Sequence, residues 1–235
     1  MNRQLWWGLL AGCLALAAGN SRAAEGLYRV EVLVFRNTQS SAEPREVDRL
    51  RGFFDLLDLD QPALPPAPVK VEQTTGTFVN LWKRLERLND YQPLAMLVYE
   101  QTRTDYHPPV RLHNDEIIAE ELHFPGPEVY LDLTAEDIFA PYVKPLYRLD
   151  GSIQLRHTRF LHIDLDLEYR VEDPAWATAP ATPTPGGEVL EGEPPEPFRV
   201  YRLKQSRQVR TDSLNYFDSP FLGALVRVTE VDAHE

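Results

Sequence analysis

Cysteine is nearly absent from this sequence, because Cys13 is the only one in 235 residues. One cysteine cannot form a disulfide within the chain or supply the several thiolates of a structural zinc site. Cys13 also lies in an N-terminal segment that we expect to be removed, so the mature chain would contain none. Folding must therefore depend on a hydrophobic core, and apolar residues make up 43% of the chain.

Positive charge is also scarce. Lysine and arginine number 24 against 36 aspartates and glutamates, which gives a formal net charge of −12. An acidic chain is repelled by nucleic acid and by anionic lipid surfaces, so neither is expected as a partner. An anionic ligand would need a local basic patch.

Motifs of catalysis and cofactor binding are missing as well. The sequence has no G-x-S-x-G, no H-E-x-x-H, no P-loop and no G-x-G-x-x-G. The histidines do not have the spacing of zinc ligands. They are His107, His113, His123, His157, His162 and His234. The sequence therefore predicts neither an enzyme nor a cofactor, although residues distant in sequence can still meet in the fold.

The N-terminal apolar run is too short to span a membrane. Arg3 precedes an uncharged stretch from Leu5 to Ala18, and Ser21-Arg22-Ala23 fits the small-x-small rule for signal peptidase. Crossing a bilayer takes about twenty apolar residues. We interpret residues 1–23 as a secretory signal peptide and expect a periplasmic protein.

Lipid anchoring is the alternative reading of this segment. Leu10-Ala11-Gly12-Cys13 fits a lipobox, in which Cys13 would become the lipidated N-terminus. The apolar run continues from Leu14 to Ala18, whereas a lipoprotein usually turns polar after its cysteine. We therefore expect ordinary cleavage after Ala23.

Residues 24–235 have the periodicities of a single α+β domain. Alternation through Val30, Val32 and Val34, with further apolar residues between them, predicts a central strand, and "PLAMLVYEQT" predicts a second. A weak helical pattern runs through residues 47–57. A stronger one fills "TFVNLWKRLERLN", with Thr77 as the expected N-cap and Asn89 as the expected stop.

The second half of the chain predicts antiparallel strands. Asp150-Gly151 opens "SIQLRHT", and "RFLHIDLDLEY" follows after a short turn, which indicates a β-hairpin. Strands are expected at "FRVYRLKQSRQVR" and "ALVRVTEV", with a turn between them. Residues 172–197 are rich in proline and glycine and predict a flexible insertion. The expected fold is α+β, a mostly antiparallel sheet with helices on one face and this insertion between strands.

The strand "RFLHIDLDLEY" places His162, Asp164, Asp166 and Glu168 on one face. They would suit a metal or acid–base chemistry. They also suit a solvated strand face, because Arg202, Lys204 and Arg210 share one face of a strand that we expect beside it. Opposite charges on neighbouring strands stabilise a sheet. We favour this structural interpretation for the carboxylates.

The segment "LNYFDSPFLG" has two interpretations. It is either a packed corner of the last hairpin, with Asp218 and Pro220 fixing the bend, or a recognition loop. In the second case Tyr216 would stack on a sugar and Asp218 would bind hydroxyl groups. Arginines nearby could then hold a carboxylate with two hydrogen bonds each. These arginines are Arg156, Arg159, Arg207 and Arg210.

Four stretches resemble the CsiV family, peptidoglycan-binding cell-shape-integrity proteins of gammaproteobacteria. They are the signal peptide leading into "YRVEVLVF", then "LNDYQPLAMLVYEQT", "LDGSIQLRHTRFLHIDLDL" and "SRQVRTDSLNYFDSPFLGALVRVT". Positions that match the family pattern are Tyr91, Leu94, Gln101, Leu149, Gly151, Arg159, Leu161, His162, Ser206, Arg207, Tyr216, Asp218, Pro220, Gly223, Leu225, Val226 and Thr229. Phe160, Met96, Tyr99, Gln208, Asn215 and Ser219 depart from it.

The resemblance implies a non-catalytic periplasmic protein that binds peptidoglycan and supports wall synthesis and cell shape. Its implied partner is a wall synthase or the lipoprotein activator of one. Two alternatives are a periplasmic hydrolase using His162, Asp164 and Asp218, and an envelope adaptor that binds only protein. The residues expected to contact the ligand are Arg159, His162, Arg207, Arg210, Tyr216 and Asp218.

Overall fold

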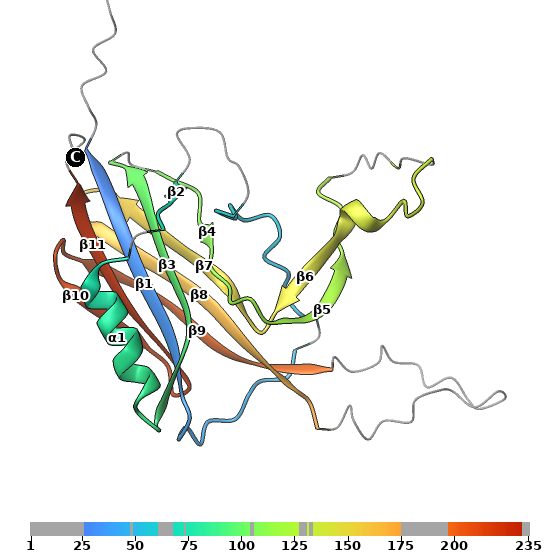
Figure 1. The fold of residues 1–235 in the computed structure, drawn as a ribbon, viewed down its shortest axis with the longest axis horizontal. Helices are drawn as coiled ribbons and strands as arrows, with labels where there is room; N and C mark the ends of the chain where they lie inside the picture. The colour runs from blue at the N-terminus through green and yellow to red at the C-terminus, as the bar shows by residue number, and fades with distance from the viewer. Residues whose placement is uncertain are drawn as a thin grey trace, which may run out of the picture.

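A computed structural model of the chain describes residues 26–47, 49–60, 68–72, 74–103, 106–126, 131, 134–174 and 197–231. Two antiparallel sheets and a small two-stranded sheet make up most of it, with one α-helix among these residues (Figure 1). The expectation of a mostly antiparallel sheet is confirmed. The expectation of several helices is wrong for the described residues.

The larger sheet has the strand order β10-β11-β1-β3-β2, and each strand runs antiparallel to its neighbours. Its strands are β1 (Leu27–Asn37), β2 (Val69–Lys70), β3 (Tyr91–Thr102), β10 (Leu214–Asp218) and β11 (Leu222–Val231). β1 lies between β11 and β3, which confirms the predicted central strand. β10 occupies part of the segment that was expected to be only a turn.

The second sheet has the order β4-β7-β8-β9. Its strands are β4 (Val110–Arg111), β7 (Leu149–His157), β8 (Leu161–Glu172) and β9 (Phe198–Val209). β7 and β8 form the predicted hairpin. β5 (Ile117–Leu122) and β6 (Val143–Tyr147) form a separate pair, with the short 3-10 helix η1 (Ala140–Tyr142) before β6.

The main core lies between the two large sheets. β1 contributes Val30, Val32 and Val34, and the second sheet contributes residues such as Ile153 and Leu165, all of them buried. Each strand shows its apolar side to the facing sheet, which is the usual way that two sheets stack. The fold is therefore a sandwich of two sheets, not one sheet with helices on it.

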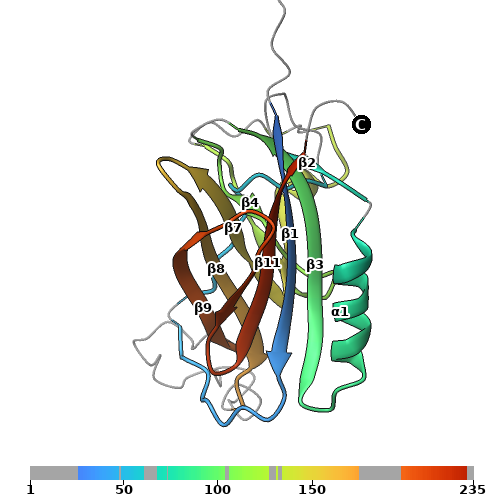
Figure 2. The ribbon, with the colours of Figure 1, turned by 90° about the vertical axis from the view of Figure 1, so that its left-hand side faces the viewer.

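The helix α1 (Gly76–Glu86) covers the other face of the larger sheet (Figure 2). Phe78 is fully buried there against Leu33 and Phe35, two β1 residues that alternate with the core valines. β1 is thus apolar on both faces, because each of its faces is covered. Among the described residues, no helix is long and apolar enough to cross a membrane.

The helix begins and ends earlier than the sequence indicated. Thr75, not Thr77, is the N-cap residue, and the last helical residue is Glu86. The hydroxyl of Thr75 makes no capping bond. It accepts a hydrogen bond from Arg227 instead, at 2.6 Å, while the Thr75 backbone N–H donates to the buried carboxylate of Glu31 at 3.0 Å. These contacts attach the start of the helix to the sheet.

The weak helical pattern of residues 47–57 forms no helix in the part that the structure describes. Leu50 is buried beside Leu146 and Val200, and Val47 and Phe54 pack against the same small cluster. The apolar residues of this segment therefore do enter a core, but as an irregular chain.

The proline-rich insertion lies largely outside the described residues, which stop at Pro174 and resume at Pro197. The strands on either side of it pair with each other, with Glu172 opposite Phe198. The two ends of the insertion are therefore fixed as neighbours by the sheet. Its expected flexibility stays a prediction.

Candidate functional site

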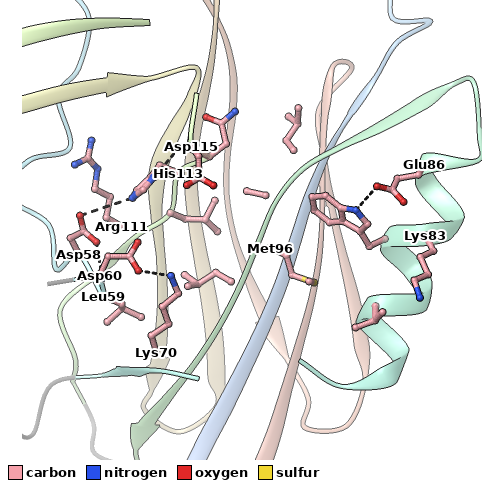
Figure 3. Close-up of a pocket in the computed structure, with 17 residues that line it drawn as sticks. Asp58, Leu59, Asp60, Lys70, Lys83, Glu86, Met96, Arg111, His113 and Asp115 are labelled. Carbon is pink, nitrogen blue, oxygen red and sulfur yellow. Dashed lines mark hydrogen bonds and ion pairs between the residues drawn. The ribbon is translucent and has the colours of Figure 1, made fainter. Parts of the chain in front are cut away.

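A pocket of about 580 Å³ lies along the edge of the larger sheet, beside β3 (Figure 3). One wall comes from α1. The other comes from three chain segments, residues 58–60, Lys70 of β2 in the larger sheet, and residues 111–115, which begin in β4 of the second sheet. Its volume is in the range of small-molecule sites, so it is large enough for a sugar or a short peptide.

The α1 wall of the pocket is aromatic and aliphatic. Trp82 is half-buried, and its indole Nε1 donates to a Glu86 carboxylate oxygen at 2.8 Å. Trp82 also packs against the cluster of Leu33 and Phe78, which limits the positions its ring can take. Met96 and Leu94 from β3 lie between the two walls. A ring held in this way offers a fixed surface for stacking.

The edge of β3 that borders the pocket has open backbone groups. β2 pairs with β3 only at Glu100 and Tyr99, and Val71 adds one N–H bond to Val98 at 2.9 Å. From Tyr91 to Leu97, no strand in the described part of the chain pairs with this edge. Edge N–H and C=O groups can bind an extended peptide, so the pocket offers backbone as well as side-chain partners.

The opposite wall of the pocket is charged. Asp58, Asp60 and Lys70 line it, and Lys70 forms an ion pair with Asp60. His113 lies beside them, with its ring stacked on Tyr147 at a centroid distance of 4.0 Å. Both charge signs and an imidazole therefore face a pocket whose other wall is apolar.

Asp166, on the outer face of the second sheet, is surrounded by cations, as the sequence predicted. It faces Lys204 across the ladder and receives two hydrogen bonds from Arg202, at 2.9 and 2.8 Å. Arg51, from outside the sheet, adds a contact of 3.3 Å. Burial alone would raise the pKa of Asp166, but these hydrogen bonds outweigh it and hold the pKa below its usual value. The ladder interpretation is confirmed for Asp166.

The neighbouring carboxylates have different partners. Asp164 binds Arg156 of β7 and not a cation of β9, and this pairing lowers its pKa against the effect of burial. Glu168 faces Arg202 across the ladder, as predicted, and lies 3.0 Å from Arg51. It is almost fully buried, and burial raises its pKa. Arg210 lies beyond the end of β9 and is no part of the ladder.

Three of the expected ligand residues meet at one edge of the sandwich. The Arg207 guanidinium donates to the Tyr216 carbonyl at 2.9 Å and lies 3.7 Å from the Asp218 carboxylate. Gln205 donates to the Asp218 carbonyl in the same way, at 2.5 Å. These contacts join β9 of one sheet to β10 of the other, so this edge has a structural role. Tyr216 is still 48% exposed.

The other expected ligand residues lie elsewhere. His162 faces outward on β8, and its Nδ1 is 3.1 Å from the Phe160 carbonyl. Arg159 lies in the turn before β8, with its guanidinium over the Phe160 ring. The three residues of the hydrolase alternative do not meet. His162 and Asp164 face outward on β8. Asp218 contacts Arg207, whose partner across the ladder is the inward-facing Ile163, so Asp218 lies on the other side of the sheet.

Sequence reasoning overlooked the pocket itself. Trp82 stands on the apolar stripe of the helix and reads as an ordinary core residue. Asp58 and Asp60 lie in a polar segment with no clear periodicity, and His113 follows more than fifty residues later. A tryptophan followed by Lys83 and Arg84 on a helix was the one local signal.

A comparison with models of known protein families shows to which family the chain belongs. The model of the family described as "Peptidoglycan-binding protein, CsiV" matches residues 46–231. The chain belongs to the CsiV family. Searches of curated proteins and of solved structures give no match. The CsiV match spans both walls of the pocket and the whole second sheet, while the central strand β1 lies before its first residue.

Proposed function

We propose that this CsiV-family protein binds peptidoglycan in the pocket beside β3. The observation that carries the proposal is the pairing of a fixed tryptophan wall with charged groups along an open strand edge. Peptidoglycan offers sugar faces, acetamido groups, and peptide amines and carboxylates. Trp82 would cover a sugar face, Lys83 would attract a carboxylate, and the β3 backbone would bind the stem peptide.

The proposal extends to the place and purpose of binding. The protein would be exported by the segment ending at Ala23, act in the periplasm without catalysis, and support wall synthesis and cell shape. Its protein partner would be a wall synthase or the lipoprotein activator of one. The family description supports the ligand, and the absence of catalytic motifs from the sequence supports a binding role.

The test is co-sedimentation with purified sacculi, with muropeptide release measured alongside. We expect binding without release, and about tenfold weaker binding for Trp82→Ala, which corresponds to roughly 1.4 kcal/mol. Trp82→Phe keeps a ring in place and should retain most of the affinity. Tyr216→Ala is the matched control, because Tyr216 is an exposed aromatic on β10, at the opposite edge of the same sheet.

Other results of this experiment would support a different function or a different binding site. Release of muropeptides would support the hydrolase alternative, and neither binding nor release would support a protein-only adaptor. Weaker binding by Tyr216→Ala but not by Trp82→Ala would move the site to the edge formed by Arg207, Tyr216 and Asp218. These three are among the six residues expected from the sequence to contact the ligand.

A further inference from the structure

The charged wall of the pocket contains a set of metal-binding atoms. Asp58, Asp60 and His113 each bring one nitrogen or carboxylate oxygen to within 4.8 Å of the others. Figure 3 shows the two carboxylates and the imidazole converging on the same side of the pocket. The Asp60 backbone N–H donates to Asp58 Oδ1 at 3.0 Å, which leaves Asp58 Oδ2 directed at the imidazole.

The imidazole of His113 is held in the orientation of a metal ligand. Its Nδ1 lies 3.0 Å from the Asn114 backbone carbonyl, which can only accept, so Nδ1 carries the proton. In the neutral ring the other nitrogen, Nε2, holds a lone pair. Metal-binding histidines commonly have this arrangement, with the second nitrogen donating to a carbonyl. Stacking on Tyr147 fixes the plane of the ring.

The Nε2 atom faces a carboxylate and not a hydrogen-bond donor. The His113 side chain is only 10% exposed, and Nε2 lies 4.0 Å from Asp58 Oδ2, too far for a hydrogen bond. No donor among the described residues reaches Nε2. A lone pair and a carboxylate therefore face each other across a gap, and a cation between them would satisfy both.

We propose that Asp58, Asp60 and His113 bind a divalent transition-metal ion of the zinc class. Two carboxylate oxygens and one imidazole nitrogen suit such an ion better than calcium or magnesium, which prefer oxygen alone. Zinc bonds to these atoms are about 2.0–2.2 Å long, so side-chain rotation must bring the ligands slightly closer. Three protein ligands leave a coordination position open toward the pocket.

Lys70 competes with the metal, because it forms an ion pair with Asp60. Its side chain is 44% exposed, so it can turn into solvent when the metal binds. Zinc would then place two positive charges beside Asp60 in place of one. We therefore expect Lys70→Ala to bind zinc more tightly than the wild-type protein.

The experiment is a calorimetric titration of purified, untagged, metal-free protein with zinc chloride. We expect one equivalent to bind, and His113→Gln and Asp58→Asn each to weaken binding at least tenfold. His123→Gln is the matched control, since His123 also lies beside an aspartate, with 2.8 Å between Nε2 and Asp55 Oδ1, but outside the pocket. Thermal melting without zinc checks that each variant folds.

Absence of zinc binding would overturn the proposal, and so would equal losses in His113→Gln and His123→Gln. Tighter binding of calcium than of zinc would exclude the imidazole as a ligand and would equally overturn it. The titration contains no peptidoglycan, so its failure and the failure of the proposed binding function are distinguishable.

Discussion

Arg111 and Asp150 form a two-point ion pair that is almost completely removed from solvent. The Arg111 Nε donates to Asp150 Oδ1 at 2.9 Å and Nη2 to Oδ2 at 2.7 Å, and the side chains are 6% and 0% exposed. Arg170, also fully buried, lies 3.5 Å from the same carboxylate. Glu168 lies 4.0 Å from Arg170 and supplies the second negative charge of this buried group. Arg111 lines the pocket as well, so Asp150 also fixes part of the pocket wall.

Asp150→Asn should therefore be strongly destabilising. It leaves Arg111 buried without its counter-charge and removes one of the two carboxylates near Arg170. Breaking a buried pair in this way costs about 3–5 kcal/mol. Urea unfolding measures the change in the free energy of unfolding. Glu172→Gln is the control, because Glu172 pairs with Arg148 but is 70% exposed, and such pairs contribute about 0.2–1 kcal/mol. Equal losses in the two variants would contradict this account of the pair.

Gly151→Ala should lower stability by about 1–3 kcal/mol, the usual cost of overpacking. A Cβ atom on Gly151 would lie 2.3 Å from the Asp166 carbonyl oxygen and 2.7 Å from Leu167 Cα, both on the paired strand β8. Backbone atoms cannot move aside as a flexible side chain can. Gly76→Ala is the matched control, since nothing lies within 4 Å of its Cβ.

Gly76 is the first residue of α1, where alanine is a better helix former, so its replacement should be neutral or stabilising by less than about 1 kcal/mol. Thermal melting compares the two variants. A Gly151→Ala protein as stable as Gly76→Ala would mean that β7 and β8 can separate without cost.

The ion pairs of Asp166 predict a specific pH dependence. Its pKa is lower in the folded protein than in the unfolded chain, so its contribution is present at neutral pH and is lost as the pH falls below about 4. We expect Asp166→Asn to lower the free energy of unfolding by about 1–2 kcal/mol at pH 7, and the difference from wild type to shrink by pH 3. Urea unfolding at both pH values tests this. A difference that does not change with pH would rule out an ionised Asp166 as its source.

Arg207→Ala should lower the free energy of unfolding and change the affinity for sacculi little. The change removes a hydrogen bond to the Tyr216 carbonyl and a contact with Asp218, two of the links between β9 and β10. A loss of about 1 kcal/mol is expected from one such hydrogen bond. Arg207→Gln is the conservative variant. Unchanged stability with lost sacculus binding would assign Arg207 to the ligand.

Asp164→Asn and Asp166→Asn should leave sacculus binding largely intact. Their carboxylates are engaged with Arg156 and Arg202 and would repel the carboxylates of a peptide. Co-sedimentation with sacculi gives the comparison with wild type. A loss of binding in either folded variant would bring the acidic face of β8 back as a candidate site.

Much of the strand structure could be predicted because strand periodicity is local. Val30, Val32 and Val34 alternate with Leu33 and Phe35, so both faces of β1 had to be covered, and the structure places a sheet on one face and α1 on the other. The charged face of β8 was predicted for the same reason. Its even positions are ionisable, and cations recur with the same period on β9.

The candidate sites are formed by contacts between residues that are far apart in sequence, and no local sequence pattern predicts such contacts. Arg207 is opposite Ile163 and therefore on the inward-facing side of β9, where a charged residue is unexpected. It is accommodated there because β10 of the other sheet lies beside it and the Tyr216 carbonyl accepts its hydrogen bond. Asp58 and Asp60 come from one segment and His113 from another, and Arg111 and Asp150 are also distant in sequence. The sequence by itself determined which residues face inward and that the chain resembles a peptidoglycan-binding family. The tertiary structure alone decided which distant side chains meet, because that depends on how the two sheets and the helix pack.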